Sequence, residues 1–230
     1  MNTTVARTEA RCGAHWLQAL DPTGRTALLV SLLSRFNHDL RTPLNTILGW
    51  THLLQKGGLD PVRIQHVADV IGRNSRDQTQ LLEEFVDDGR AILGVLQLQS
   101  AALQIDEAVG QAIDRVSSML TLHGVFLQSK LATADVSVNG DARRLTRLAY
   151  RLLAIIVRRA REASTIEVES AVNHGACTLS LSGSAYEPDW SDAALLDLRI
   201  STLIAALHDG ELHVGPDTTR PCIELKLPRL

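Results

Sequence analysis

The chain has 230 residues, of which 45% are hydrophobic and 3% aromatic, and its formal net charge is −3. This length suits two domains, and the acidic balance argues against a nucleic-acid binder, which needs a basic surface. The three cysteines are widely spaced, which argues against a disulfide framework or a zinc site. With no signal-peptide pattern near Met1 and no apolar run long enough to span a bilayer, we expect a cytoplasmic protein without a membrane partner.

Two long helices are predicted after a weakly patterned N-terminal extension, residues 1–23, whose role the sequence leaves open. Asp21-Pro22-Thr23-Gly24 is a turn signal, and apolar residues then recur every three or four positions until Gly57-Gly58 ends the first helix. Asp60 is expected to cap the second helix, with Pro61 at its first position. The apolar positions of the first helix are Leu28, Leu32, Phe36, Leu40, Leu44, Ile47 and Leu48.

Residues 24–93 are therefore predicted to form an antiparallel helical hairpin. One hairpin by itself leaves an apolar stripe uncovered. We expect a second copy to cover it, which gives a homodimer held by a four-helix bundle.

Residues 94–230 alternate between short β-rich segments and helical segments, which predicts an α/β second domain. The expected strands are Val95–Gln99, Val125–Lys130, Ile166–Val172, Cys177–Ser182, Glu211–Val214 and Cys222–Leu227. The expected helices are Asp106–His123, Asp141–Glu162 and Ser191–Leu207.

The stretch from Phe36 to Asn45 carries the clearest chemistry. His38 is two residues from Phe36 and from Leu40, so its side chain should point away from the apolar stripe, on the same face as Thr42 and Asn45. An exposed imidazole is a nucleophile near neutral pH, and the adjacent Asp39 can accept a proton or hold the tautomer. Pro43 costs a helix about 3 kcal/mol, which suggests that a kink is needed there.

This stretch resembles the H-box of histidine kinases of the HisKA type, in which a phosphoacceptor His is followed by an acidic residue and then Leu-Arg-Thr-Pro-Leu. The resemblance continues through Ile47-Leu48-Gly49-Trp50 and on to Gly94. It implies that His38 is the phosphoacceptor, Asp39 its acid/base partner and Thr42 a residue with a possible phosphatase role. It also implies that response-regulator receiver domains dock near Arg41, Asn45 and Gly49.

The second domain resembles the ATP-binding domain of the same family, at Gly140-Asp141-Ala142-Arg143-Arg144-Leu145 and from Ile200 to Val214. The predicted fold class is therefore α + α/β: a helical hairpin that dimerises into a four-helix bundle, followed by an α/β sandwich of the Bergerat type. The boundaries expected from sequence are 1–23, 24–93 and 94–230.

The nucleotide motifs of this second domain depart from the family pattern. Ile155 stands where the family has a magnesium-binding Asn, and Ile offers no oxygen to a hard cation. The stretch Leu181–Tyr186 lacks the expected adenine-reading Asp. Leu195 and Asp197 replace glycines that, in the family, let backbone N–H groups approach the phosphates of the nucleotide. The negative charge of Asp197 would also repel these phosphates. We therefore expect no productive ATP binding, no stably bound cofactor and no metal site, with Mg²⁺ supplied by a partner receiver domain.

Four functions remain open from the sequence. The first in rank is a pseudo-histidine-kinase that acts as a histidine phosphotransfer protein between His38 and receiver domains. The alternatives are a non-catalytic regulator that sequesters a response regulator or a kinase, a response-regulator phosphatase that uses Thr42, and an ATP-dependent autokinase, in that order.

Overall fold

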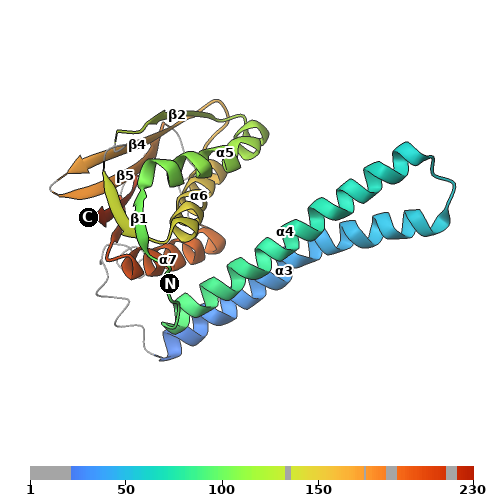
Figure 1. Ribbon diagram of the computed structural model, residues 1–230, viewed down its shortest axis with the longest axis horizontal. Coiled ribbons are helices and arrows are strands. Elements are labelled where there is room, and N and C mark those ends of the chain that lie inside the picture. The colour runs from blue at the N-terminus through green and yellow to red at the C-terminus, as the bar shows by residue number, and fades with distance from the viewer. Residues whose placement is uncertain (1–21, 133–135, 174, 185–190, 216–221) are drawn as a thin grey trace. The chain divides into compact units, whose positions relative to one another are not determined.

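The computed structural model describes residues 22–132, 136–173, 175–184, 191–215 and 222–230, so the extension predicted at residues 1–23 lies almost wholly outside the described residues. The chain divides into two compact units, one formed by Asp21–Leu96 and one by the described residues from Gln97 onward (Figure 1). Within the described part of the chain, no helix is long and apolar enough to cross a membrane.

The first unit is a hairpin of two long helices, α3 (Pro22–Lys56) and α4 (Pro61–Leu93), which lie side by side (Figure 1). The predicted signals at the turn are confirmed. Gly57 and Gly58 adopt left-handed φ angles of 71° and 80°, which end α3. The carboxylate of Asp60 accepts the backbone N–H of Arg63 at 2.8 Å, and Pro61 occupies the first turn.

The turn predicted at Asp21–Gly24 is wrong, because α3 begins at Pro22. A proline fits the first turn of a helix, since its φ is already helical and its missing N–H would have no partner there. Pro43 also lies inside α3, as predicted, and is buried.

The apolar stripe predicted for the first helix divides between two surfaces. Leu28 and Leu32 are buried, and the Phe36 ring stacks on Phe85 of α4 with 4.0 Å between centroids. Leu44 and Leu48 instead remain 46% and 57% exposed. The hairpin thus covers only part of its apolar surface.

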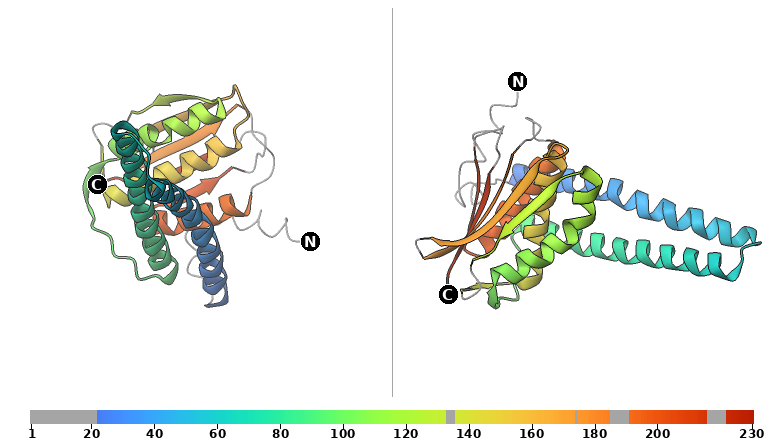
Figure 2. Two further views of the ribbon diagram at one scale, coloured as in Figure 1. Left: turned by 90° about the vertical axis from the view of Figure 1, so that its right-hand side faces the viewer. Right: turned by 90° about the horizontal axis from the view of Figure 1, so that it is seen from above.

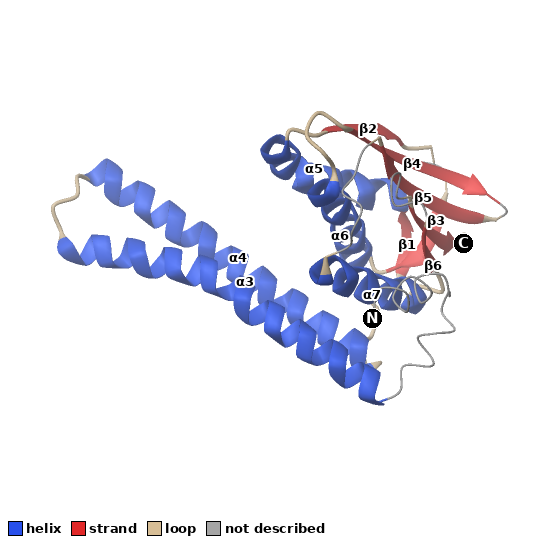
Figure 3. Cartoon of the chain, turned by 180° about the vertical axis from the view of Figure 1, so that it is seen from behind, coloured by secondary structure: helices blue, strands red, loops and turns tan. Residues whose placement is uncertain are grey.

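The second unit is a sheet covered on one face by α5 (Ile105–His123), α6 (Ala142–Arg159) and α7 (Asp192–Leu207), as the turned views show (Figures 2 and 3). The five strands of the sheet run in the order β2 (Phe126–Lys130), β4 (Thr165–Asn173), β5 (Ala176–Gly183), β7 (Ile223–Pro228) and β6 (Glu211–Val214). The β2–β4 pair is parallel, and the other pairs are antiparallel. Along β4, Ile166 and Val168 are buried whereas Glu167 and Glu169 are exposed, as expected for a sheet covered on one side.

A small second sheet corrects two sequence predictions. The strand expected at Val95–Gln99 is absent, because the Val95 N–H instead donates to Arg90 at the end of α4. The strand that does form is β1 (Ala101–Gln104), which pairs with β3 (Ser137–Gly140), a strand that was not predicted. The remaining elements agree with the predictions, and the fold class, a helical hairpin followed by a mixed α/β domain, is confirmed.

Gly210 marks a close approach between the end of α7 and β7. A Cβ at this position would lie 2.5 Å from the carbonyl oxygen of Lys226 and 2.7 Å from Leu227 Cδ2. We predict that Gly210→Ala lowers the free energy of unfolding by about 1–3 kcal/mol, because the backbone must shift.

The matched control is Gly110→Ala within α5, where a Cβ meets nothing within 4 Å. It should be neutral or stabilising by up to about 1 kcal/mol. Urea unfolding measures both, and equal effects would contradict the prediction.

Candidate functional site

His38 projects from the middle of α3, and its side chain is 84% exposed. Its Nδ1 lies 3.2 Å from Oδ1 of Asp39. The other carboxylate oxygen of Asp39 accepts from Nε of Arg35, one turn earlier, at 3.4 Å. The three side chains form a short chain of charge-assisted contacts that orients the imidazole at the surface.

The contact with Asp39 determines which imidazole nitrogen is available for chemistry. A carboxylate can only accept hydrogen bonds, so Nδ1 must carry the proton in this arrangement. In the neutral ring, Nε2 then holds the free lone pair. The site therefore presents an exposed ring nitrogen with a free lone pair, beside a carboxylate that can stabilise a positively charged ring.

The other residues proposed for this site lie on the same helix. Thr42 and Asn45 are exposed one and two turns after His38, and Arg41 and Gly49 are also exposed. The Thr42 carbonyl oxygen accepts from the Thr46 hydroxyl at 3.0 Å. Sequence and structure agree on placing these groups along α3.

The positions that depart from the nucleotide motifs lie within the helix layer of the second unit. Ile155 of α6 is 1% exposed and belongs to the core. Leu195 and Asp197 lie on the first turns of α7, where Asp197 is 2% exposed. Oδ1 of Asp197 lies 3.4 Å from Nε of Arg151, a buried residue of α6, and Oδ2 lies 4.0 Å from the Arg158 guanidinium.

This buried ion pair was not predicted from the sequence. The only signal was an arginine at position 151 within the apolar run Leu148–Val157. A charged residue in a buried helix segment needs a group of opposite charge beside it. The pair binds α6 to α7 where the resemblance would put a magnesium nucleotide. An aliphatic side chain and an engaged carboxylate offer a nucleotide neither an oxygen for Mg²⁺ nor backbone N–H groups for phosphate, so these residues do not fit that ligand.

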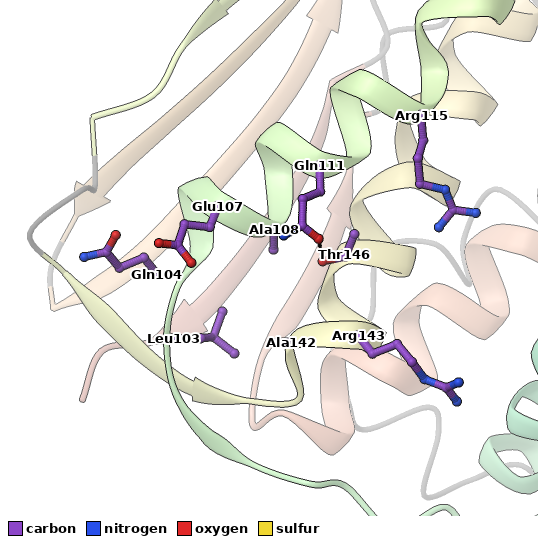
Figure 4. Close-up of a pocket in the computed structure, with 9 residues that line it drawn as sticks. All are labelled: Leu103, Gln104, Glu107, Ala108, Gln111, Arg115, Ala142, Arg143 and Thr146. Atoms are coloured by element: carbon purple, nitrogen blue, oxygen red, sulfur yellow. Dashed lines mark hydrogen bonds between the residues drawn. The ribbon is translucent and has the colours of Figure 1, made fainter.

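A cavity of 360 Å³ opens between β1, α5 and the start of α6 (Figure 4). Its lining combines the apolar side chains of Leu103 and Ala108 with the charged side chains of Glu107 and Arg143. The Gln111 side-chain oxygen accepts from the Thr146 hydroxyl at 3.4 Å across it. None of the residues proposed from the sequence lines this cavity. In the part of the chain that the structure describes, no group of three or more His, Cys, Asp or Glu could hold a metal ion.

Comparison with known proteins agrees with both units. Residues 29–94 match the His Kinase A (phospho-acceptor) domain, HisKA. The cell-division control histidine kinase PdhS of Brucella ovis is 26% identical over 129 residues, which cover 55% of this chain but only 12% of that relative. The chain therefore corresponds to a small part of PdhS.

Two solved structures share the fold. Acinetobacter baumannii histidine kinase AdeS matches with a TM-score of 0.60 and 16% identity, covering 83% of this chain and 97% of that one. Histidine kinase ThkA, solved in complex with response regulator protein TrrA, matches with a TM-score of 0.56 and 15% identity, covering 90% of this chain and 64% of that one. Residues 29–94 are therefore a HisKA hairpin of the kind found in two-component histidine kinases, and the second unit has the fold of the histidine kinase catalytic domain.

The Asp197–Arg151 pair gives a stability prediction. Asp197→Ala leaves Arg151 buried without this carboxylate and should lower the free energy of unfolding by about 3–5 kcal/mol. The double replacement Arg151→Met with Asp197→Leu removes both charges and should recover most of that loss. Arg158→Ala is the control, because this side chain is half exposed, and it should cost less than about 1 kcal/mol. Thermal or urea unfolding of the four proteins tests this, and no recovery in the double variant would contradict it.

Proposed function

We propose that this chain is a histidine phosphotransfer protein, a histidine kinase family member that exchanges phosphate between His38 and response-regulator receiver domains without using ATP. The observation that carries the proposal is a contrast in exposure. The His38–Asp39 pair is open to a macromolecular partner. At the positions assigned to the nucleotide motifs, Ile155 and Asp197 are both buried.

The transfer needs only groups present on α3 and on the partner. Nε2 of His38 attacks the phosphorus of a phosphoaspartyl group on the receiver domain, so an N–P bond forms. The P–O bond to the receiver aspartate breaks, and its electron pair leaves with the aspartate oxygen as a carboxylate. The ring becomes positively charged with its proton kept on Nδ1, where the Asp39 carboxylate 3.2 Å away stabilises it.

The reverse reaction returns the phosphoryl group to a receiver aspartate, so the site can relay phosphate in either direction. Mg²⁺ would be held by the receiver domain, which explains how phosphotransfer persists without a nucleotide site on this chain. Receiver domains would approach the exposed surface of α3 formed by Arg41, Thr42, Asn45 and Gly49. The solved complex of ThkA with a response regulator supports a partner of this class.

We further propose that two copies form a homodimer through a four-helix bundle. Leu33 is 53% exposed on α3, and Leu44 and Leu48 are also exposed. These residues are separated by 11 and 4 positions, close to whole helical turns, so they share one side of α3. An exposed leucine stripe on a long helix is the surface that a second hairpin covers.

Phosphotransfer is tested by mixing the full chain with a receiver domain carrying labelled phosphoaspartate. We expect acid-labile label on this chain and none on His38→Gln. Asp39→Asn should lower the transfer rate by about 100-fold, because the positive ring loses its carboxylate. Incubation with labelled ATP and Mg²⁺ should give no label, with an active kinase of the family as positive control.

The outcomes separate the alternatives. Receiver binding that survives His38→Gln, with no transfer of label, would favour the sequestering regulator. Release of phosphate that depends on Thr42 but not on His38 would favour the phosphatase. Label from ATP on His38 would replace the phosphotransfer proposal with an autokinase.

The dimer proposal is tested by Leu44→Glu. A carboxylate placed in the apolar contact between hairpins should weaken association by about 100-fold or more, because it must be buried without a cation. Ser31→Glu is the control, since Ser31 is exposed on another side of α3 and its hydroxyl donates to Ala27. Sedimentation equilibrium measures the dissociation constant, and an equal effect of the two variants would contradict the bundle.

A further inference from the structure

The carboxylate of Asp141, just before α6, holds together two segments that are distant in sequence. Oδ1 accepts the backbone N–H of Arg144 at 3.1 Å and so caps α6. Oδ2 accepts the backbone N–H of Gln99 at 3.0 Å and also pairs with the Arg144 guanidinium. Gln99 lies just before β1, three residues after Leu96, which ends the hairpin unit.

The position of Asp141 is in turn fixed by a buried histidine after α7. Nε2 of His208 accepts the backbone N–H of Asp141 at 3.2 Å, and Nδ1 donates to the carbonyl oxygen of Ile204 at 2.7 Å. One neutral tautomer satisfies both contacts. The packing is tight: a Cβ on Gly140 would lie 3.0 Å from the ring carbon Cδ2 and 2.6 Å from Leu145 Cδ1.

A second proton on His208 would break this arrangement. The proton would sit on Nε2, where it faces the Asp141 N–H, so two donors would point at each other and a buried N–H would lose its acceptor. The charged groups that face the ring are Asp141 and Arg144 from the start of α6 and Asp209 from the turn after α7. The carboxylates favour the charged ring, but its burial opposes charging more strongly.

The directions of the pKa shifts agree with this geometry. Burial lowers the pKa of His208 below its ordinary value of 6.5, and the bond to Ile204 and the charge of Asp141 offset this only in part. Burial alone would raise the pKa of Asp141, but the hydrogen bonds from Gln99 and Arg144 outweigh it and hold that pKa below its ordinary value of 3.8. Asp141 therefore stays ionised at pH 5.0, which lies above its ordinary pKa of 3.8.

We propose that Asp141 and His208 form a pH-sensitive joint, which holds Gln99 at the start of α6 at neutral pH and releases it when His208 becomes protonated. With the joint closed, residues 97 and 98 are the segment between the hairpin unit and Gln99. With the joint open, the next held residue is Ala101 in β1, paired with Gly140. This segment then gains two residues, which adds about 7 Å of reach.

Because the pKa of His208 is lowered in the closed joint, acid favours opening of the joint. The neutral ring stabilises the closed joint fully above pH 6.5. As the pH falls below this value, His208 binds a proton when the joint is open but not when it is closed. Protonation therefore favours the open joint. At pH 5.0, 1.5 units below the ordinary pKa, the opening constant should have risen by up to about 30-fold.

Hydrogen exchange on the full chain tests the joint at pH 7.5 and pH 5.0, with rates corrected for intrinsic exchange. The protection factors of peptides covering residues 97–104 and 139–147 should be up to about 30-fold lower at pH 5.0 than at pH 7.5. A peptide from the β4–β5 hairpin, residues 166–182, should keep its protection. His208→Gln retains an acceptor oxygen that does not titrate, so its protection should not depend on pH.

His213→Gln is the matched control, because His213 is partly exposed and pairs with Glu211; it should behave as the unmodified chain. Unchanged protection in the unmodified chain at pH 5.0 would overturn the joint, as would a loss that persists in His208→Gln. If His208→Gln does not fold, an NMR titration of the His208 ring replaces it. A protonation midpoint above 6.5, or protonation without loss of Gln99 protection, would overturn the proposal.

Discussion

A carboxylate that is 2% exposed must have a cation beside it, and in this protein Asp197 of α7 has Arg151 of α6. The two residues are 46 positions apart in sequence, so their contact sets how α7 lies along α6. Much of the second unit depends on this register. Helix α6 is buried along most of its length by α5, α7 and the sheet, and a shift along its axis would move the charge of Arg151 away from Asp197.

The two units use charge in opposite ways. On α3, Asp39 lies at the surface and contacts both Arg35 and His38, so it orients a ring without removing it from solvent. On α7, Asp197 is buried and its contacts hold helices together. The first arrangement suits a site that meets partners, and the second suits a scaffold. This difference, more than the family resemblance, is why we favour phosphate exchange over ATP-dependent phosphorylation.

The helical hairpin could be predicted almost completely, because each of its signals is local. The helical period, Asp60 with Pro61, and the glycine pair all act within a few residues. The contact between His38 and Asp39 is also local, since the two residues are neighbours in sequence. By contrast, the strands β1 and β3 have four residues each and form because they pair with one another. The two segments are far apart in sequence, so a local sequence pattern cannot predict this pairing.

Long-range contacts set the other limits of prediction. The partner of Arg151, and the contact of His208 with Asp141 across 67 positions, depend on how α6 and α7 pack. Similarly, the period of α3 marks Leu32 and Leu44 equally as apolar, but only packing against α4 separates the buried leucine from the exposed one.

The parallel pairing of β2 with β4 has a consequence for how the second unit assembles. Phe126 lies opposite Thr165, 39 residues later, with α6 between them, whereas β4 and β5 are joined by a tight turn at Gly175. Closing the short loop loses less chain entropy, so the β4–β5 hairpin should form early and β2 should join the sheet late. Until β2 arrives, the edge of β4 presents unpaired backbone groups to other chains. Strand β2 then becomes the edge of the sheet, where its short length of five residues and its terminal Lys130 limit edge-to-edge aggregation.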